Sequence, residues 1–131
     1  MADGLAAGKR HREVQTVIGA IGVHSCVLGG LMLLAPRAIV GLVGFPQTGP
    51  IFFASQSGIF LLVLGLCYLL ALGNRALVPV ILVSKALAVP FLLLHALFQG
   101  APPLIWGAAA GDAAMLLALS VVLYRSGYWR R

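Results

Sequence analysis

Four long apolar runs are the feature that most constrains the fold of this chain. They cover residues 14–35, 51–72, 76–98 and 104–124. Each run approaches the roughly 20 residues that an α-helix needs to cross the hydrocarbon core of a bilayer. Backbone polar groups inside that core must be satisfied within the protein, and a helix does this within a single segment. The sequence therefore predicts an all-α integral membrane protein with four spanning helices.

The composition agrees with a membrane setting. The chain has 131 residues, a length typical of one domain, so residues 1–131 are interpreted as a single membrane domain. Hydrophobic residues make up 61% of the chain and charged residues 9%, which is too few charges to cover a soluble domain. The net charge is +6, but the basic residues flank the apolar runs, where they act as topology signals. The sequence predicts the lipid bilayer as a partner and argues against nucleic-acid binding.

The connections between the runs predict how the helices follow one another. The stretches "GNR" and "QGAPP" join the last three runs and are short enough to make those helices antiparallel neighbours. The fold class predicted is thus a four-helix bundle with antiparallel, up-and-down topology. The first connection is longer, and its residues 36–45 have two interpretations. They lie in the membrane interface as an amphipathic turn, or they form an apolar loop packed on the bundle.

The distribution of Lys and Arg predicts the orientation. In a four-span topology, one side of the membrane has only Arg37, and the other side has seven basic residues: Lys9, Arg10, Arg12, Arg75, Arg125, Arg130 and Arg131. Basic residues are enriched in cytoplasmic connections. Both termini are therefore predicted to lie in the cytoplasm.

Two charged residues interrupt the apolar runs, and their depths suggest that they meet. At about 1.5 Å per residue, Lys85 lies roughly 13 Å and Asp112 roughly 18 Å from the cytoplasmic edge. A lone charge at mid-membrane costs at least ~2.5–3.5 kcal/mol. The two side chains lie on consecutive antiparallel helices, so the sequence predicts a Lys85–Asp112 ion pair. The pair either fixes the rotation of the two helices or forms a site for a proton, an ion or a headgroup.

Three further polar residues are candidates for the same site. His24 has a depth between those of Lys85 and Asp112, so it either joins the pair or serves as a hydrogen-bonded packing residue. Gln56 and His95 lie toward the outer side, where they would line an entrance or hydrogen-bond across helices. The sequence contains no nucleophile–base pair and no metal-ligand cluster. It predicts no catalytic residue and no metal site, leans away from an enzyme and points to no cofactor.

Small residues recur every three or four positions and predict where helices come close. Such residues would contact a neighbouring helix or a second copy of the chain. The series are Gly22, Cys26 and Gly30 in the first run, Ala54 and Gly58 in the second, and Gly107, Gly111, Ala114 and Ala118 in the fourth.

One family resemblance follows from several of these features together. A "P…GFP" loop precedes the stretch "GIFLLVLGLCYLLALGN", which is followed by a lysine-bearing third run, by "PP" and by "GD" opening into "LYR". This pattern resembles the DoxX-like proteins, which are small four-helix bacterial membrane proteins. The resemblance covers roughly residues 34–125 and implies a multi-pass protein of the bacterial inner membrane. Some relatives are associated with thiosulfate:quinone oxidoreduction or oxidative-stress complexes as small membrane subunits.

Two functions remain open at this point. The resemblance implies a non-catalytic accessory or scaffold subunit of a membrane complex, with another membrane protein or a second copy as its partner. The alternative is a binding or transport protein for a small lipid, a quinone or an ion, with Lys85 and Asp112 in its site.

Overall fold

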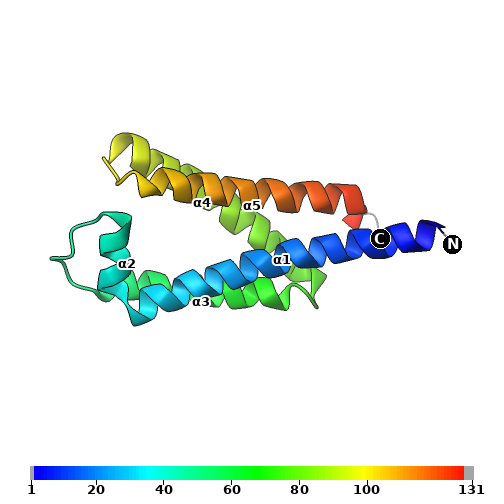
Figure 1. The fold of residues 1–131 in the computed structure, drawn as a ribbon, viewed down its shortest axis with the longest axis horizontal. Coiled ribbons are helices and arrows are strands. Elements are labelled where there is room, and N and C mark those ends of the chain that lie inside the picture. Colours follow the sequence, from blue (N-terminus) through cyan, green and yellow to red (C-terminus); the bar gives the residue numbers. More distant parts are fainter. Residues whose placement is uncertain (1, 129–131) are drawn as a thin grey trace.

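The chain is helical almost throughout. The computed structural model describes residues 2–128, and side chains are described for residues 8–128. Within this part of the chain there is no β-strand. The elements are α1 (Ala2–Leu34), α2 (Pro36–Val43), α3 (Phe52–Leu70), the 3₁₀-helix η1 (Arg75–Leu77), α4 (Val78–Phe98) and α5 (Leu104–Ser126), as Figure 1 shows.

Four helical segments are long and apolar enough to cross a membrane. They are Gly8–Leu34, Phe52–Leu70, Arg75–Phe98 and Leu104–Ser126. Many large apolar side chains on these segments are exposed, which suits lipid contact and would be costly in water. The prediction of an all-helical chain with four membrane-length apolar helices is confirmed.

The first helix begins well before its apolar run. The sequence placed its start at residue 14, whereas α1 begins at Ala2. Residues 2–13 contain Ala, Lys, Arg and Glu, which favour helix even in water. Hydropathy marks where a helix enters lipid, which need not be where the helix begins. The helix α1 therefore carries a polar extension before Val14.

The helices α1 and α3 pack closely because glycines remove side chains from their contact. A Cβ atom added at Gly29 would lie 2.5 Å from the Leu62 backbone nitrogen. One added at Gly65 would lie 2.7 Å from the Cys26 backbone nitrogen. The predicted contact through small residues is present between α1 and α3, but one member there is wrong. Gly30 faces open space, and its neighbour Gly29 takes its place in the contact. Gly107 and Gly111 of the predicted series in the fourth run face open space, so that series makes no close helix contact at these two positions.

The other close pair consists of α4 and α5, and α3 and α4 diverge. Figure 1 shows α3 running along α1 while α4 leaves the end of α3 and runs along α5. The prediction that α3 and α4 are lengthwise neighbours is therefore wrong. A short connection fixes only the point where two helices meet. Beyond that point, the glycine-containing face of α3 packs on α1, and α4 packs on α5 instead of on α3.

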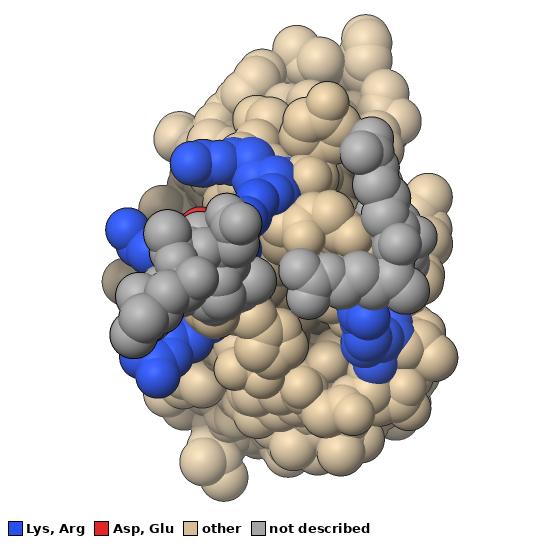
Figure 2. Space-filling model, turned by 90° about the vertical axis from the view of Figure 1, so that its right-hand side faces the viewer, with Lys and Arg blue, Asp and Glu red and all other residues tan. Residues whose placement is uncertain are grey.

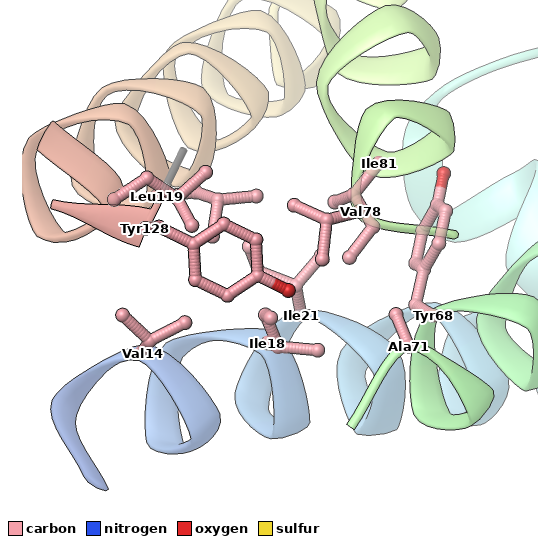
Figure 3. Close-up of a cluster of buried hydrophobic side chains, with 10 residues drawn as sticks. Val14, Ile18, Ile21, Tyr68, Ala71, Val78, Ile81, Leu119 and Tyr128 are labelled. Atoms are coloured by element: carbon pink, nitrogen blue, oxygen red, sulfur yellow. The ribbon is translucent and has the colours of Figure 1, made fainter. Parts of the chain in front are cut away.

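The hydrophobic core lies at one end, where both pairs meet. It combines the middle of α1, the end of α3, the start of α4 and the end of α5, as Figure 3 shows. Apolar contacts of this kind join the two helix pairs at this end. The buried residues are Val14, Ile18, Ile21, Tyr68, Ala71, Val78, Ile81, Leu119, Leu123 and Tyr128.

Basic side chains gather on the face around the same end. Figure 2 shows Lys and Arg spread over this face, with little acidic surface in view. The start of α1, the end of α5 and the connection between α3 and α4 lie here in Figure 1. The basic residues of these segments are Lys9, Arg10, Arg12, Arg75 and Arg125.

The short helix α2 lies at the opposite end of the molecule, beside the end of α1 and the start of α3 (Figure 1). Pro36 occupies its first turn, where a missing N–H costs nothing. Gly44 ends it with a φ of 102°, a left-handed conformation that favours glycine. Residues 36–43 are thus a helix that also contacts α1 and α3, and its position in the membrane interface stays a prediction.

Candidate functional site

A buried charged contact joins α4 to α5. Lys85 Nζ lies 2.5 Å from Asp112 Oδ1, and the two side chains are 7% and 16% exposed. Val78, Ile81 and Lys85 lie on one face of α4, because residues three and four apart stack on the same side of a helix. The antiparallel α5 brings Asp112 to the same level. The structure therefore forms the contact that the depths of these residues predict.

A second polar contact joins α4 to α3. The hydroxyl groups of Tyr68 and Ser84 are hydrogen-bonded to each other. Ser84 Oγ donates its proton to the Ile81 carbonyl oxygen at 3.0 Å, so Tyr68 is the donor in the contact between the two hydroxyls. Sequence reasoning missed both residues. The available signal was that each is polar within an apolar run and lies near the same short connection.

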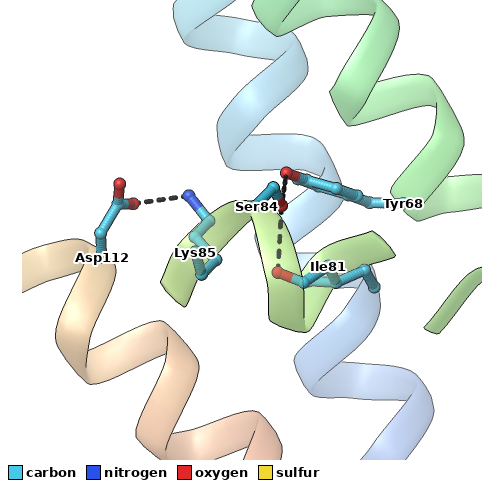
Figure 4. A network of polar contacts seen from close by, with 5 residues as sticks. All are labelled: Tyr68, Ile81, Ser84, Lys85 and Asp112. Carbon is cyan, nitrogen blue, oxygen red and sulfur yellow. Dashed lines mark hydrogen bonds and ion pairs between the residues drawn. The ribbon is translucent and has the colours of Figure 1, made fainter. Parts of the chain in front are cut away.

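Together the two contacts make α4 the central element of the site. Ser84 and Lys85 are consecutive, so their side chains leave the helix about 100° apart, as expected for 3.6 residues per turn. Figure 4 shows Lys85 directed to Asp112 on one side and Ser84 directed to Tyr68 on the other. Polar contacts thus fix the rotation of α4 against α3 and α5 at nearly the same depth.

The hydrogen-bonding capacity of the Lys85 ammonium group is only partly used by the described residues. An ammonium group carries three donors. Among the described residues, Asp112 Oδ1 is the one acceptor that contacts Lys85 Nζ. Elsewhere in the fold, Ser25 on α1 is fully buried, and its hydroxyl has no hydrogen-bond partner among the described residues. Buried polar groups usually find partners, so these atoms retain capacity for further hydrogen bonds.

His24 does not join the pair. Its side chain is exposed, whereas Ser25 beside it is buried in the core-facing side of α1. The two neighbours point about 100° apart on the helix, so only one can face inward. No hydrogen bond or ion pair of the described residues connects His24 to Lys85 or Asp112. Of the two alternatives for His24, the three-residue centre with Lys85 and Asp112 is not formed.

Gln56 and His95 also lie apart from the pair. Gln56 is half-buried near the start of α3. His95 is exposed on α4, where its Nδ1 donates to the Phe91 carbonyl oxygen at 2.8 Å and its ring lies 4.2 Å from the Phe91 ring. Because α3 and α4 diverge toward this end, the structure does not bring the two residues together (Figure 1).

The described residues offer no obvious metal site. No group of three or more His, Cys, Asp or Glu side chains lies together among them. Cys26 and Cys67 are half-buried and free of any disulfide. The chemistry that this site can supply is charge pairing and hydrogen bonding by Lys85 and Asp112.

The fold and site define the class: an all-helical chain with four membrane-length helices, compatible with a multi-pass membrane protein. Comparisons with known proteins add no relative to this class. No family model, no curated protein and no solved structure matches the chain. The resemblance to DoxX-like proteins therefore stays a prediction.

Proposed function

We propose that this chain is a small multi-pass protein of the bacterial inner membrane, of DoxX-like type, that serves as a non-catalytic accessory or scaffold subunit. One observation carries the proposal. Lys85 and Asp112 are engaged with each other between two packed helices, at 2.5 Å. An acid and a base used in this way hold α4 and α5 in one rotation, as structural ion pairs do. The partner would be a membrane protein or a second copy of the chain.

The orientation belongs to the same proposal. In a four-helix, up-and-down bundle, both termini and Arg75 lie on the cytoplasmic side, because this side has seven basic residues and the other has only Arg37. A green fluorescent protein fused to the C-terminus is expected to fluoresce, and alkaline phosphatase fused at the same position is expected to be inactive. An active phosphatase with a dark fluorescent protein would reject this orientation. A phosphatase fusion in residues 45–50, on the opposite side, is the matched control and should be active.

Purification from a mild detergent tests the subunit hypothesis. The full chain, carrying an affinity tag, is expected to retain one membrane protein at a constant ratio through size exclusion, or to elute as a defined homo-oligomer. Mass spectrometry of the eluted protein identifies a bound protein partner, and mass spectrometry of its organic extract identifies a bound lipid or quinone. A monomer that carries a stoichiometric lipid or quinone and no partner would contradict the subunit hypothesis.

That contradicting result would favour the second candidate function, a binding or transport protein for a small lipid, a quinone or an ion. The unused hydrogen-bonding capacity of the Lys85–Asp112 pair supports this second function. Lys85 Nζ has donors beyond the one that contacts Asp112, and the Asp112 side chain retains 16% exposure. A carbonyl oxygen or a water molecule could satisfy those donors.

A further inference from the structure

The exposed side chain of His24 lies at a depth where lipid would surround it. His24 follows Val14, the start of the apolar run, by roughly 15 Å along α1, which is well inside the hydrocarbon core of a bilayer. Among the described residues, no group hydrogen-bonds to His24, forms an ion pair with it or stacks on its ring. Hydrocarbon offers an imidazole no hydrogen-bond partner, and ionisable side chains in spanning helices almost always face protein or pair with one another. We therefore expect a further protein surface over His24.

The side of α1 that carries His24 faces away from the rest of the chain. Gly22 contacts α3, and His24 lies about 160° around the helix axis from Gly22. Ile21 is buried in the hydrophobic core, on another side of α1. By contrast, Val27 and Leu31, which follow His24 by about one and two helical turns, are 55% and 45% exposed. The chain's own helices thus leave this side of α1 open.

The spacing along this side suits a lengthwise contact with another helix. Four exposed residues form it, and we call them the His24 face: Ala20, His24, Val27 and Leu31. They are spaced by four, three and four positions, which is the average period of 3.5 residues by which two helices pack along their length. In such a seam, a single polar residue among apolar ones fixes the register of the two helices. His24 is that residue here.

The geometry points to a second copy of this chain as the occupant of the His24 face, with the two α1 helices parallel and their His24 rings hydrogen-bonded to each other. Copies that insert in the same orientation are related by a two-fold axis along the membrane normal, so both His24 side chains lie at one depth. A neutral imidazole has one donor and one acceptor nitrogen and is therefore complementary to a copy of itself. A different protein would need its own polar group at this depth. The inference rests on the proposed subunit function and names its partner.

Photo-crosslinking in membranes tests which molecule covers the face. In the full chain, p-benzoylphenylalanine replaces Val27 on the His24 face. The matched control replaces Val83 on α4, which is 57% exposed against 55% for Val27. After irradiation, the Val27 variant is expected to give a product of twice the mass of the chain in intact-protein mass spectrometry. The Val83 variant is expected to give several-fold less of this product.

Substitutions of His24 test the hydrogen bond. Energy transfer between labelled copies in liposomes, at a fixed ratio of protein to lipid, measures the dimer. His24→Leu is expected to lower the dimer association constant several-fold, because it removes a hydrogen bond between helices. His24→Asn should restore most of it, because an amide also has donors and an acceptor. His95→Leu is the matched control and should change little, since His95 is also exposed on a spanning helix but contacts the Phe91 carbonyl oxygen of its own helix.

The inference is overturned if Val27 and Val83 give equal amounts of the doubled product, or if His24→Leu associates as wild type does. A Val27 product that contains a different protein also overturns the second copy, but it leaves the subunit function in place. A chain that stays monomeric and retains a lipid or quinone contradicts the subunit function itself. The crosslink does not depend on how a His24 variant folds, so the two measurements are independent.

Discussion

Lys85→Ala and Asp112→Ala are each expected to destabilise the protein by about 3–5 kcal/mol, the largest effect expected of any single substitution here. The reason is that each change leaves the opposite charge without its partner at mid-membrane. The remaining side chain must stay charged and unpaired or become neutral, and both outcomes cost free energy. Thermal unfolding and the yield of folded protein in detergent measure the effect. Arg12→Ala, at an exposed position near the end of the molecule, is the control and should change little.

The double variant Lys85→Met with Asp112→Leu should recover much of that stability. It leaves no orphan charge, so its cost should be well below the sum of the two single costs. Its behaviour also separates the two candidate functions. A scaffold whose pair is structural keeps its partner in this variant, whereas a binding or proton site is abolished although the protein folds. If either single variant is as stable as wild type, the two side chains do not depend on each other.

Gly29→Ala is expected to destabilise the protein by about 1–3 kcal/mol, and Gly30→Ala is not. The Cβ added at position 29 would lie 2.5 Å from the Leu62 backbone nitrogen and 2.8 Å from the Gly58 carbonyl oxygen. Both neighbours are backbone atoms, so relief requires α1 and α3 to move apart. At Gly30 no atom lies within 4 Å, and alanine there gains up to about 1 kcal/mol of helix propensity.

The two glycines are adjacent in the sequence, so this pair of variants isolates the contact from every other property of α1. The midpoint of thermal unfolding in detergent should fall for Gly29→Ala and stay level or rise for Gly30→Ala. A second pair, Gly65→Ala against Gly19→Ala, should repeat the pattern, because Gly65 contacts Cys26 and Gly19 faces open space. Equal midpoints within either pair would mean that α1 and α3 do not pack as closely as described.

The sequence was enough to estimate how deep each residue lies along its helix. Each residue adds about 1.5 Å along a helix, so the apolar runs gave the membrane-length segments and placed Lys85 and Asp112 within reach of each other. The same reasoning placed His24 at the right depth for the pair, although its side chain is exposed. The start of the apolar run also gave the wrong start for α1, because a helix does not have to begin where its apolar segment begins.

Direction around each helix axis was decided only by tertiary packing. Small residues are common in this chain, so their spacing alone did not distinguish Gly29 from Gly30, and the divergence of α3 and α4 had no local signal. The contact of Tyr68 with Ser84 likewise requires knowing which face of α4 meets the end of α3. The sequence by itself determined four membrane-length helices and the depth of the charged pair. Which faces meet depends on contacts between residues far apart in the chain, so only the folded structure decides it.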